Sequence, residues 1–214
     1  MPSPPSTGLV PVDAALQQVV REVVGFQRDH GVMVSPRDNL SGTLALVDEG
    51  ETVLLLPGEH FFTADLVVSR RVRLVGLGRV RLRFYDAKLS VTGADVSIEG
   101  IEFVRDVRSA AAPVVQLSGV RGHVDRCTFD GPSVYGVRVS GNYCAVRACR
   151  FLPHASHAAA DADCYWQDGV TYGIVSGNSW SGTRTYVLDY QAAFNMSQAA
   201  NGPGPPPGIV NERP

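Results

Sequence analysis

The sequence has almost no lysine and no long hydrophobic run. Its basic residues are 18 arginines and the single Lys88, and the formal net charge is -2. That charge argues against a general nucleic-acid binder, which needs a cationic surface for the phosphate backbone. Because no run of 18 apolar residues occurs, we expect no membrane-spanning helix. The first residues, MPSPPSTGLVPVD, lack the basic and apolar regions of a signal peptide, so we expect a protein assembled in the bacterial cytoplasm.

A repeat of 22 to 26 residues runs through the middle of the chain, in segments 67–77, 91–103, 117–129 and 139–151. When these segments are aligned, apolar residues recur in four columns. The columns are Val67, Val91, Leu117, Val139; Leu74, Ile98, Val124, Val146; Leu77, Ile101, Cys127, Cys149; and Phe103, Phe129, Phe151. Such a period is typical of a solenoid, in which no repeat is stable without its neighbours.

The repeats predict strands rather than helices, because apolar residues alternate with polar ones and are rich in Val and Ile. Each segment holds two short strands joined at a bend by Gly93, Gly119, Gly141 or Ser69. Like residues would then stack inward at the inter-strand distance of about 4.8 Å. Two outward columns are expected as well: Arg71, Asp95, Arg121; and Val75, Glu99, Asp125, Arg147. Opposite charges stacked in this way stabilise neighbouring strands modestly.

The segment 50–78, GETVLLLPGEHFFTADLVVSRRVRLVGLG, resembles the opening of the pectate-lyase-like superfamily, in which a TVxxxPGxY rung precedes a VxLxGxG rung. The resemblance covers roughly residues 50–190. It implies a single-stranded right-handed parallel β-helix, which we expect to have about six coils and, from the residues before it, an N-terminal capping or docking α-helix. Because the superfamily contains lyases, hydrolases, phage tailspikes and structural proteins, the resemblance indicates a fold rather than a reaction. The paired aspartates and the GHG motif of polygalacturonases are missing.

Three regions are expected along the chain. Residues 1–45 form a proline-rich arm and a helix from Asp13 to about His30, which either caps the solenoid or mediates docking and trimerisation. Residues 46–195 form the parallel β-helix. Residues 196–214 form a proline- and glycine-rich tail.

The repeat breaks at 152–169, LPHASHAAADADCYWQDG, which we interpret as a surface loop. Our preferred hypothesis gives it a binding role, because aromatic anchors carry much of the binding energy at recognition surfaces. The glycan- or partner-binding residues would be Tyr143, Tyr165, Trp166 and Trp180. The register after residue 152 stays open: VSGN at 175–178 repeats VSGN at 139–142, but Trp180 can instead align with Phe151.

Two chemical alternatives exist for the same loop. A pair among Asp161, Asp163 and Asp168 would supply the acid and base of glycoside cleavage. His154, His157, Asp161 and Asp163 would form a metal site, although their spacing matches no established ligand signature. Our preferred hypothesis includes neither, and it expects no cofactor.

The cysteines and the arginine run at 70–83 have structural interpretations. Cys127, Cys149 and Cys144 are expected to point inward as small apolar side chains, with a disulfide between stacked neighbours as the alternative. Cys164 would be a nucleophile only with a histidine beside it. The six arginines of the run are expected to pair with acidic residues on outer faces, and the alternative is a patch for an anionic glycan.

The sequence therefore favours a structural virion protein of the phage spike or tail fibre kind. It would assemble as an oligomer, most simply a homotrimer, contact other particle proteins through its N-terminal region and bind a surface polysaccharide during host attachment. The alternative is a polysaccharide lyase or glycoside hydrolase. Neither nucleic acid nor a membrane is an expected partner.

Overall fold

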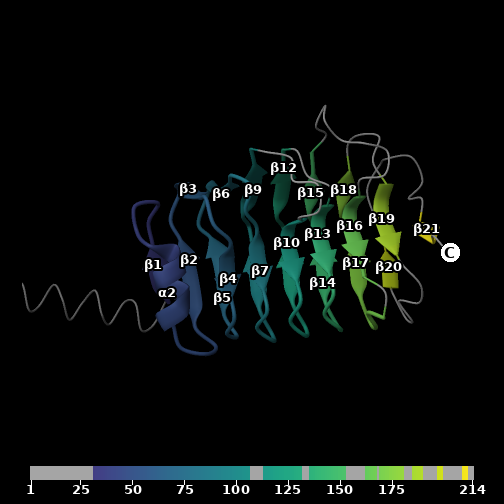
Figure 1. Ribbon diagram of the computed structural model, residues 1–214, viewed down its shortest axis with the longest axis horizontal. Coiled ribbons are helices and arrows are strands. Elements are labelled where there is room, and N and C mark those ends of the chain that lie inside the picture. Colours follow the sequence, from purple (N-terminus) through teal and green to yellow (C-terminus); the bar gives the residue numbers. More distant parts are fainter. Residues whose placement is uncertain are drawn as a thin grey trace, which may run out of the picture.

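The protein forms a parallel β-solenoid in a computed structural model, which describes residues 31–106, 113–131, 135–152, 162–167 and 169–180. It also describes the backbone of three later strands, 185–189, 197–199 and 209–211. All its strand pairs are parallel, and they form three sheets that run along the long axis (Figure 1). This confirms the expected all-β parallel β-helix. Within the described part, no helix is long and apolar enough to cross a membrane.

The three sheets are named A, B and C. Sheet A has eight strands: β1 (Val32–Val34), β2 (Thr52–Leu55), β5 (Arg73–Gly76), β8 (Ser97–Glu99), β11 (His123–Asp125), β14 (Ala145–Arg147), β17 (Ile174–Ser176) and β20 (Ser197–Ala199). Sheet B has six: β3 (Gly58–Phe62), β6 (Val80–Phe84), β9 (Glu102–Arg105), β12 (Thr128–Asp130), β15 (Arg150–Phe151) and β18 (Ser179–Trp180). Sheet C has seven: β4 (Leu66–Val68), β7 (Leu89–Val91), β10 (Pro113–Leu117), β13 (Tyr135–Val139), β16 (Ala162–Trp166), β19 (Thr185–Asp189) and β21 (Ile209–Asn211).

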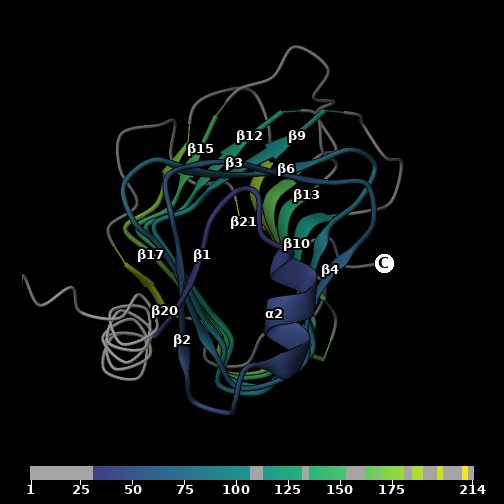
Figure 2. The same ribbon diagram turned by 90° about the vertical axis from the view of Figure 1, so that its left-hand side faces the viewer.

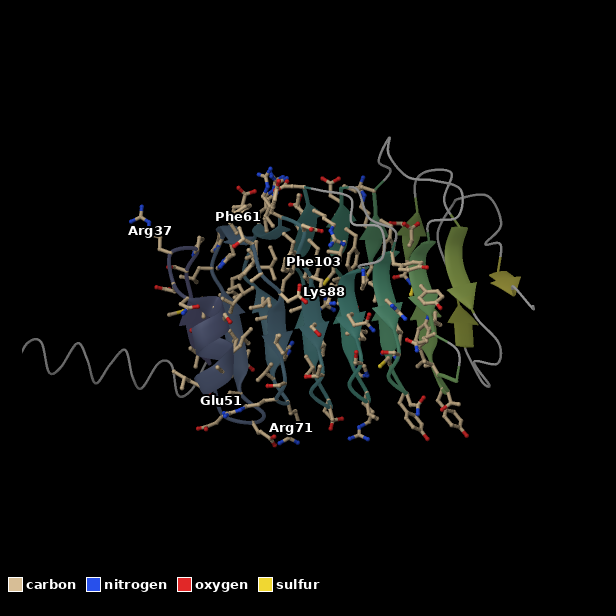
Figure 3. All side chains as sticks on the ribbon, viewed as in Figure 1. Arg37, Glu51, Phe61, Arg71, Lys88 and Phe103 are labelled. Carbon is tan, nitrogen blue, oxygen red and sulfur yellow. The ribbon has the colours of Figure 1, made fainter. Side chains whose placement is uncertain are left out.

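Each coil passes from sheet C to sheet A to sheet B, so the sheets surround one interior (Figure 2). The second column, Leu74, Ile98, Val124 and Val146, is in register across sheet A, and all four side chains are fully buried. The phenylalanine column is also confirmed: the ring centroids of Phe103 and Phe129 lie 5.2 Å apart, and those of Phe129 and Phe151 lie 4.8 Å apart. Phe103 is among the side chains labelled in Figure 3.

Two residues of the first repeat, Val67 and Leu77, were predicted to point inward but are partly exposed. Val67 is 48% exposed and pairs with Ser90, whereas Val68 pairs with Val91 and is buried. The reason is a shorter bend, because Val68 precedes Leu74 by six positions and Val91 precedes Ile98 by seven.

Leu77, assigned to the third column, is 38% exposed. The corner after β5 is longer than in later coils, since Leu74 precedes Leu82 by eight positions while Ile98 precedes Phe103 by five. The extra residues carry Leu77 out of the stack.

The register after residue 152 is settled by two strand pairs. Val175 pairs with Val146 in sheet A, and Trp180 pairs with Phe151 in sheet B. The second VSGN therefore occupies a different sheet from the first, whose Val139 lies in sheet C. The expected loop 152–169 also contains a regular strand, β16, so this part of the loop prediction was wrong. In β16, Cys164 and Trp166 point inward and Tyr165 points outward. This alternation was not recognised in the sequence because acidic residues surround it.

A short helix, α2 (Leu40–Leu46), covers the N-terminal opening of the solenoid (Figure 2). The Oδ1 atom of Asn39 caps it by accepting a hydrogen bond from the Gly42 amide at 3.0 Å. Leu40 and Leu44 are buried beneath it. The helix expected at 13–30 lies outside the described residues. Strand β1 before residue 46 and strands β20 and β21 after residue 195 also pair within the solenoid, outside the bounds expected for it.

Two corners of the coil repeat the same backbone conformation. Between sheets C and A, Asp95, Arg121, Tyr143 and Tyr172 have φ of 55°, 58°, 60° and 58°. Between sheets A and B, Gly100, Arg126, Ala148 and Gly177 have φ of 66°, 51°, 49° and 64°. This left-handed conformation costs a residue with a Cβ about 1 kcal/mol. The corner between sheets C and A nevertheless carries three long side chains, whereas the corner between sheets A and B carries one, Arg126.

Candidate functional site

A row of polar and aromatic side chains crosses the outer face of sheet C. Gln116 of β10 pairs with Arg138 of β13, which pairs with Tyr165 of β16. Their strand neighbours Val115, Val137 and Cys164 are fully buried. The alternation of a strand therefore turns Gln116, Arg138 and Tyr165 outward in three consecutive coils. We call these three residues the sheet C row.

Arg138 is held in place by an aromatic ring and an amide. Its guanidinium carbon lies 5.5 Å from the centroid of the Tyr165 ring, and its Nη2 donates to Oε1 of Gln167 at 3.0 Å. Its Nε atom is buried and has no hydrogen-bond partner among the described residues. A cation over an aromatic face is stabilised by about 0.5–1 kcal/mol at a partly exposed site. The guanidinium is thus oriented before any ligand arrives.

A second aromatic ring lies beside this arrangement. The ring centroids of Tyr135 and Tyr165 are 4.6 Å apart, with an interplanar angle of 18°. Both side chains are half-buried. A tyrosine pair of this kind gives a rigid apolar surface with phenolic oxygens at its border.

Amide and hydroxyl groups continue the row toward the earlier coils. Nε2 of Gln116 donates to Oγ of Ser140 at 3.0 Å, and the hydroxyls of Ser140 and Ser118 lie 3.3 Å apart. Such groups both donate and accept hydrogen bonds. Together with the tyrosines and Arg138, they form a surface suited to a hydroxylated ligand that carries negative charge.

Trp166, expected as a binding anchor, belongs to the core. Its side chain is fully buried, and its backbone pairs with Val139. It continues an inward column that contains Val91, Leu117 and Val139 in the preceding coils. A buried indole presents no face to a sugar or a receptor, so this part of the binding hypothesis was wrong.

The other expected aromatic residues do not gather in one place. Tyr143 lies at the corner between sheets C and A, is 49% exposed and stacks on Tyr172 with 4.8 Å between ring centroids. Trp180 has its backbone in sheet B, and its side chain lies outside the described part. Only Tyr165 of the predicted set belongs to the sheet C row.

The chemical alternatives depend mostly on residues that are not described. Asp161, Asp168, His154 and His157 lie outside the described residues. Asp163 is described, and its side chain is only 3% exposed, so it does not lie open to a substrate. Within the described ranges, no three or more His, Cys, Asp or Glu side chains form a group that could hold a metal ion.

All four cysteines are buried thiols. Burial raises the pKa of Cys144 to about 11 and raises the pKa of Cys127 and Cys164 strongly. A thiol with a raised pKa is a poor nucleophile because little thiolate is present. The structural interpretation of Cys127, Cys144 and Cys149 is confirmed, and the burial of Cys164 contradicts a nucleophilic role.

Four of the six arginines of the run form the expected ion pairs on the outer faces of sheets A and B, namely Arg73, Arg79, Arg81 and Arg83. Arg70 instead donates to the backbone carbonyl of Val47. The Nε–Oε1 distance between Arg73 and Glu99 is 2.8 Å, and Arg83 holds Asp106 at 2.7 Å. The expected column at the first corner is confirmed as well, since Nη2 of Arg121 donates to Oδ2 of Asp95 at 2.8 Å. The ion pair with Asp106 raises the pKa of Arg83 above its ordinary value.

Sequence reasoning missed most of the sheet C row. Gln116 and Arg138 of the row were not among the expected binding residues, and neither were Tyr135 and Gln167, which lie beside it. The signal was present in PVVQL (113–117) and YGVRV (135–139), whose alternation places Gln116 and Arg138 on the outer face.

One solved structure supports the assignment of the fold. The crystal structure of pectate lyase Pel9A matches this chain with a TM-score of 0.62 at 16% sequence identity. The match covers 85% of this chain and 56% of that one, so the chain spans just over half the length of Pel9A. No protein-family model and no curated protein sequence matches the chain. At this identity the similarity supports the parallel β-helix fold and says nothing about activity.

Proposed function

We propose that this protein binds an acidic polysaccharide along the outer face of sheet C. The observation that carries the proposal is the guanidinium of Arg138, which is fixed over the Tyr165 ring and bonded to Gln167. A preoriented arginine can receive a carboxylate through two parallel hydrogen bonds. The neighbouring tyrosine surface offers an apolar face to the C–H groups of a sugar ring.

The row also follows the axis of the solenoid. Gln116, Arg138 and Tyr165 come from three successive coils, which are stacked at about the 4.8 Å spacing of neighbouring strands. A linear chain laid along this axis would meet a hydrogen-bonding side chain at each coil. The similarity to a pectate lyase supports this choice of ligand, because pectate is an acidic polysaccharide.

Affinity electrophoresis in gels containing polygalacturonate tests the proposal, with dextran as the neutral control polymer. We expect retardation in polygalacturonate, and we expect Arg138→Ala and Tyr165→Ala each to weaken binding about tenfold. Arg147→Ala removes an exposed arginine from sheet A and serves as the charge-matched control. Equal mobility of all proteins in both gels would contradict the proposal.

The enzyme alternative is separated by looking for products. A lyase or hydrolase would release unsaturated uronides or reducing ends, and Asp161→Asn or Asp168→Asn would abolish the release without abolishing binding. Our proposal expects binding without release. Turnover that depends on those carboxylates would replace it with the catalytic alternative.

We further propose that the recognition serves host attachment by an oligomeric spike or fibre of a phage-like particle. This part depends on the sequence resemblance alone and stays a prediction. Sedimentation of the protein with purified particles, detected by an antibody, would support it. Recovery of all the protein away from the particles would contradict it.

A further inference from the structure

A hollow of about 170 Å³ lies at the corner between sheets A and B. It is present because two of its lining residues, Gly78 and Gly100, have no side chains and have φ of 75° and 66°. A Cβ at either position would meet no atom closer than 3.5 Å. The glycines therefore leave space here.

Arg126 reaches into this space from an unusual position. It belongs to the corner column whose other members are Gly100, Ala148 and Gly177, so it is the one long side chain in that column. Its φ of 51° carries the cost of the left-handed conformation. The side chain turns back by one coil, so that its Nη2 lies 2.7 Å from Oε2 of Glu99, and its Nη1 lies 2.9 Å from Oδ2 of Asp125.

Arg79 lines the same hollow with donors that are not in use. Its side chain is 73% exposed, and its Nε lies 3.3 Å from Oε2 of Glu102. Arg81 holds the same carboxylate more closely, at 2.7 Å, and its hydrogen bond is the main cause of the lowered pKa of Glu102. The terminal nitrogens of Arg79 have no partner among the described residues, so they remain free to bind a further oxyanion.

A second hollow shares the lining residue Arg79 with the first. It has a volume of about 240 Å³, and Arg79, Arg81, Glu59 and Gly58 line it. Arg79 thus stands between two concave spaces on the outside of the solenoid. The hydroxyl of Thr128, which lines the first hollow, adds a neutral hydrogen-bonding group.

We propose that the hollow between Arg79 and Arg126 is a binding site for a single oxyanion, such as the carboxylate or sulfate group of an acidic saccharide. Both arginines line this one concave space, and the terminal nitrogens of Arg79, which have no partner among the described residues, can hold such a group through charge-assisted hydrogen bonds with Arg126 beside them. The site lies at the corner between sheets A and B, away from the sheet C row, so it is separate from the proposed function.

Isothermal titration of the full chain tests the site with three probes: trigalacturonate, inorganic sulfate and neutral maltotriose. The measurements use the Arg138→Ala background, which removes the contribution of the sheet C row. We expect Arg79→Ala and Arg126→Ala each to weaken binding of the anionic probes about tenfold. Arg79→Lys keeps the charge but loses the planar fork, so we expect an intermediate loss. Maltotriose should give no heat.

Arg73→Ala is the matched control. It also removes an arginine bound to Glu99, but Arg73 lines neither hollow. Loss of sulfate affinity in the two site variants alone supports the oxyanion site with a free ion as its ligand, and a larger loss for trigalacturonate supports a saccharide. Unchanged affinity in both site variants, or an equal loss in Arg73→Ala, would overturn the proposal. Circular dichroism melting curves confirm that each variant is folded.

Discussion

Trp166 and Gly173 fill one layer of the core together: a Cβ on Gly173 would lie only 2.3 Å from Cζ3 of Trp166. In an earlier coil, Leu117 and Gly122 occupy the equivalent positions. There, a Cβ on Gly122 would lie 3.5 Å from Cδ2 of Leu117, which is an ordinary contact distance. The large side chain and the glycine are therefore complementary.

This complementarity predicts that Gly173→Ala destabilises the protein by about 1–3 kcal/mol through overpacking. Urea unfolding gives the free energy of unfolding of each variant. Trp166→Phe makes room for the added methyl group, so the double variant should lose less than the sum of the two single losses. Strict additivity would show that the two side chains do not share the space.

The buried His60 predicts a loss of stability in acid. Its side chain is 2% exposed, and burial lowers its pKa, while the carbonyl of Leu56 and the charge of Asp38 act in the opposite direction. The folded state favours neutral His60, so the unfolded chain binds the proton more tightly. The free energy of unfolding should therefore fall as the pH drops below about 6.5, the ordinary pKa of histidine.

Urea titrations between pH 8 and pH 5 measure this dependence. His60→Leu should remove the part of the pH dependence of the unfolding free energy that comes from His60. His123 also has a lowered pKa, mainly through burial and secondarily through Arg147, so His123→Gln is the matched control and should leave the His60 part unchanged. The same slope in His60→Leu and in the natural protein would contradict the prediction.

The register of the repeat predicts a sharp difference between inward and outward positions. Ile98 is fully buried, and Ile98→Asp would place an unpaired charge in the dry stack, which should prevent folding. The Arg121 side chain is 54% exposed, and Arg121→Ala should change the melting temperature little. Comparable losses in the two variants would show that the register is wrong.

Because the thiols are buried, we expect them to react slowly with thiol reagents in the native state. Native protein should react with Ellman's reagent much more slowly than urea-unfolded protein, because all four thiols are buried and the pKa of Cys144 is raised to about 11. The absorbance of the released thionitrobenzoate follows the reaction. Rapid native reaction of even one thiol would contradict the prediction.

Oligomer formation remains a prediction that sedimentation can decide. The side chains of Leu46, the last residue of α2, and of Phe61, which is labelled in Figure 3, are 82% and 56% exposed near the N-terminal end of the solenoid. Association would cover such apolar groups and the strand edges beside them. We expect analytical ultracentrifugation to show an oligomer, most simply a trimer. A single monomeric species at micromolar concentration would contradict this.

Much of the fold could be predicted from the sequence because each coil buries apolar side chains at equivalent positions. Ile98, Val124 and Val146 occupy equivalent positions, so one correct column places whole strands. The errors at Val67 and Leu77 occurred where a bend or a corner changes length, and apolar periodicity alone does not reveal such a change.

The candidate site was harder to predict because side chains far apart in the sequence create it. Arg138 and Tyr165 meet only after the chain has completed a further coil, whose length the irregular stretch before β16 concealed. Trp166 was misplaced for the opposite reason. Tryptophan is a residue type common at binding sites, but the position of Trp166 in the inward–outward alternation of β16 places it in the core.

The spacing of hydrogen-bonded partners has a consequence for how the chain reaches this state. Cross-coil hydrogen bonds between described residues join positions roughly one coil apart, for example 23 for Ser140 with Leu117, 26 for Arg121 with Asp95 and 29 for Asn178 with Cys149. Within the described part of the chain, each coil therefore pairs with the coils beside it. Folding can begin at any well-formed pair of coils and extend in both directions. For the same reason, duplicating one whole coil should lengthen the solenoid without disturbing the coils on either side.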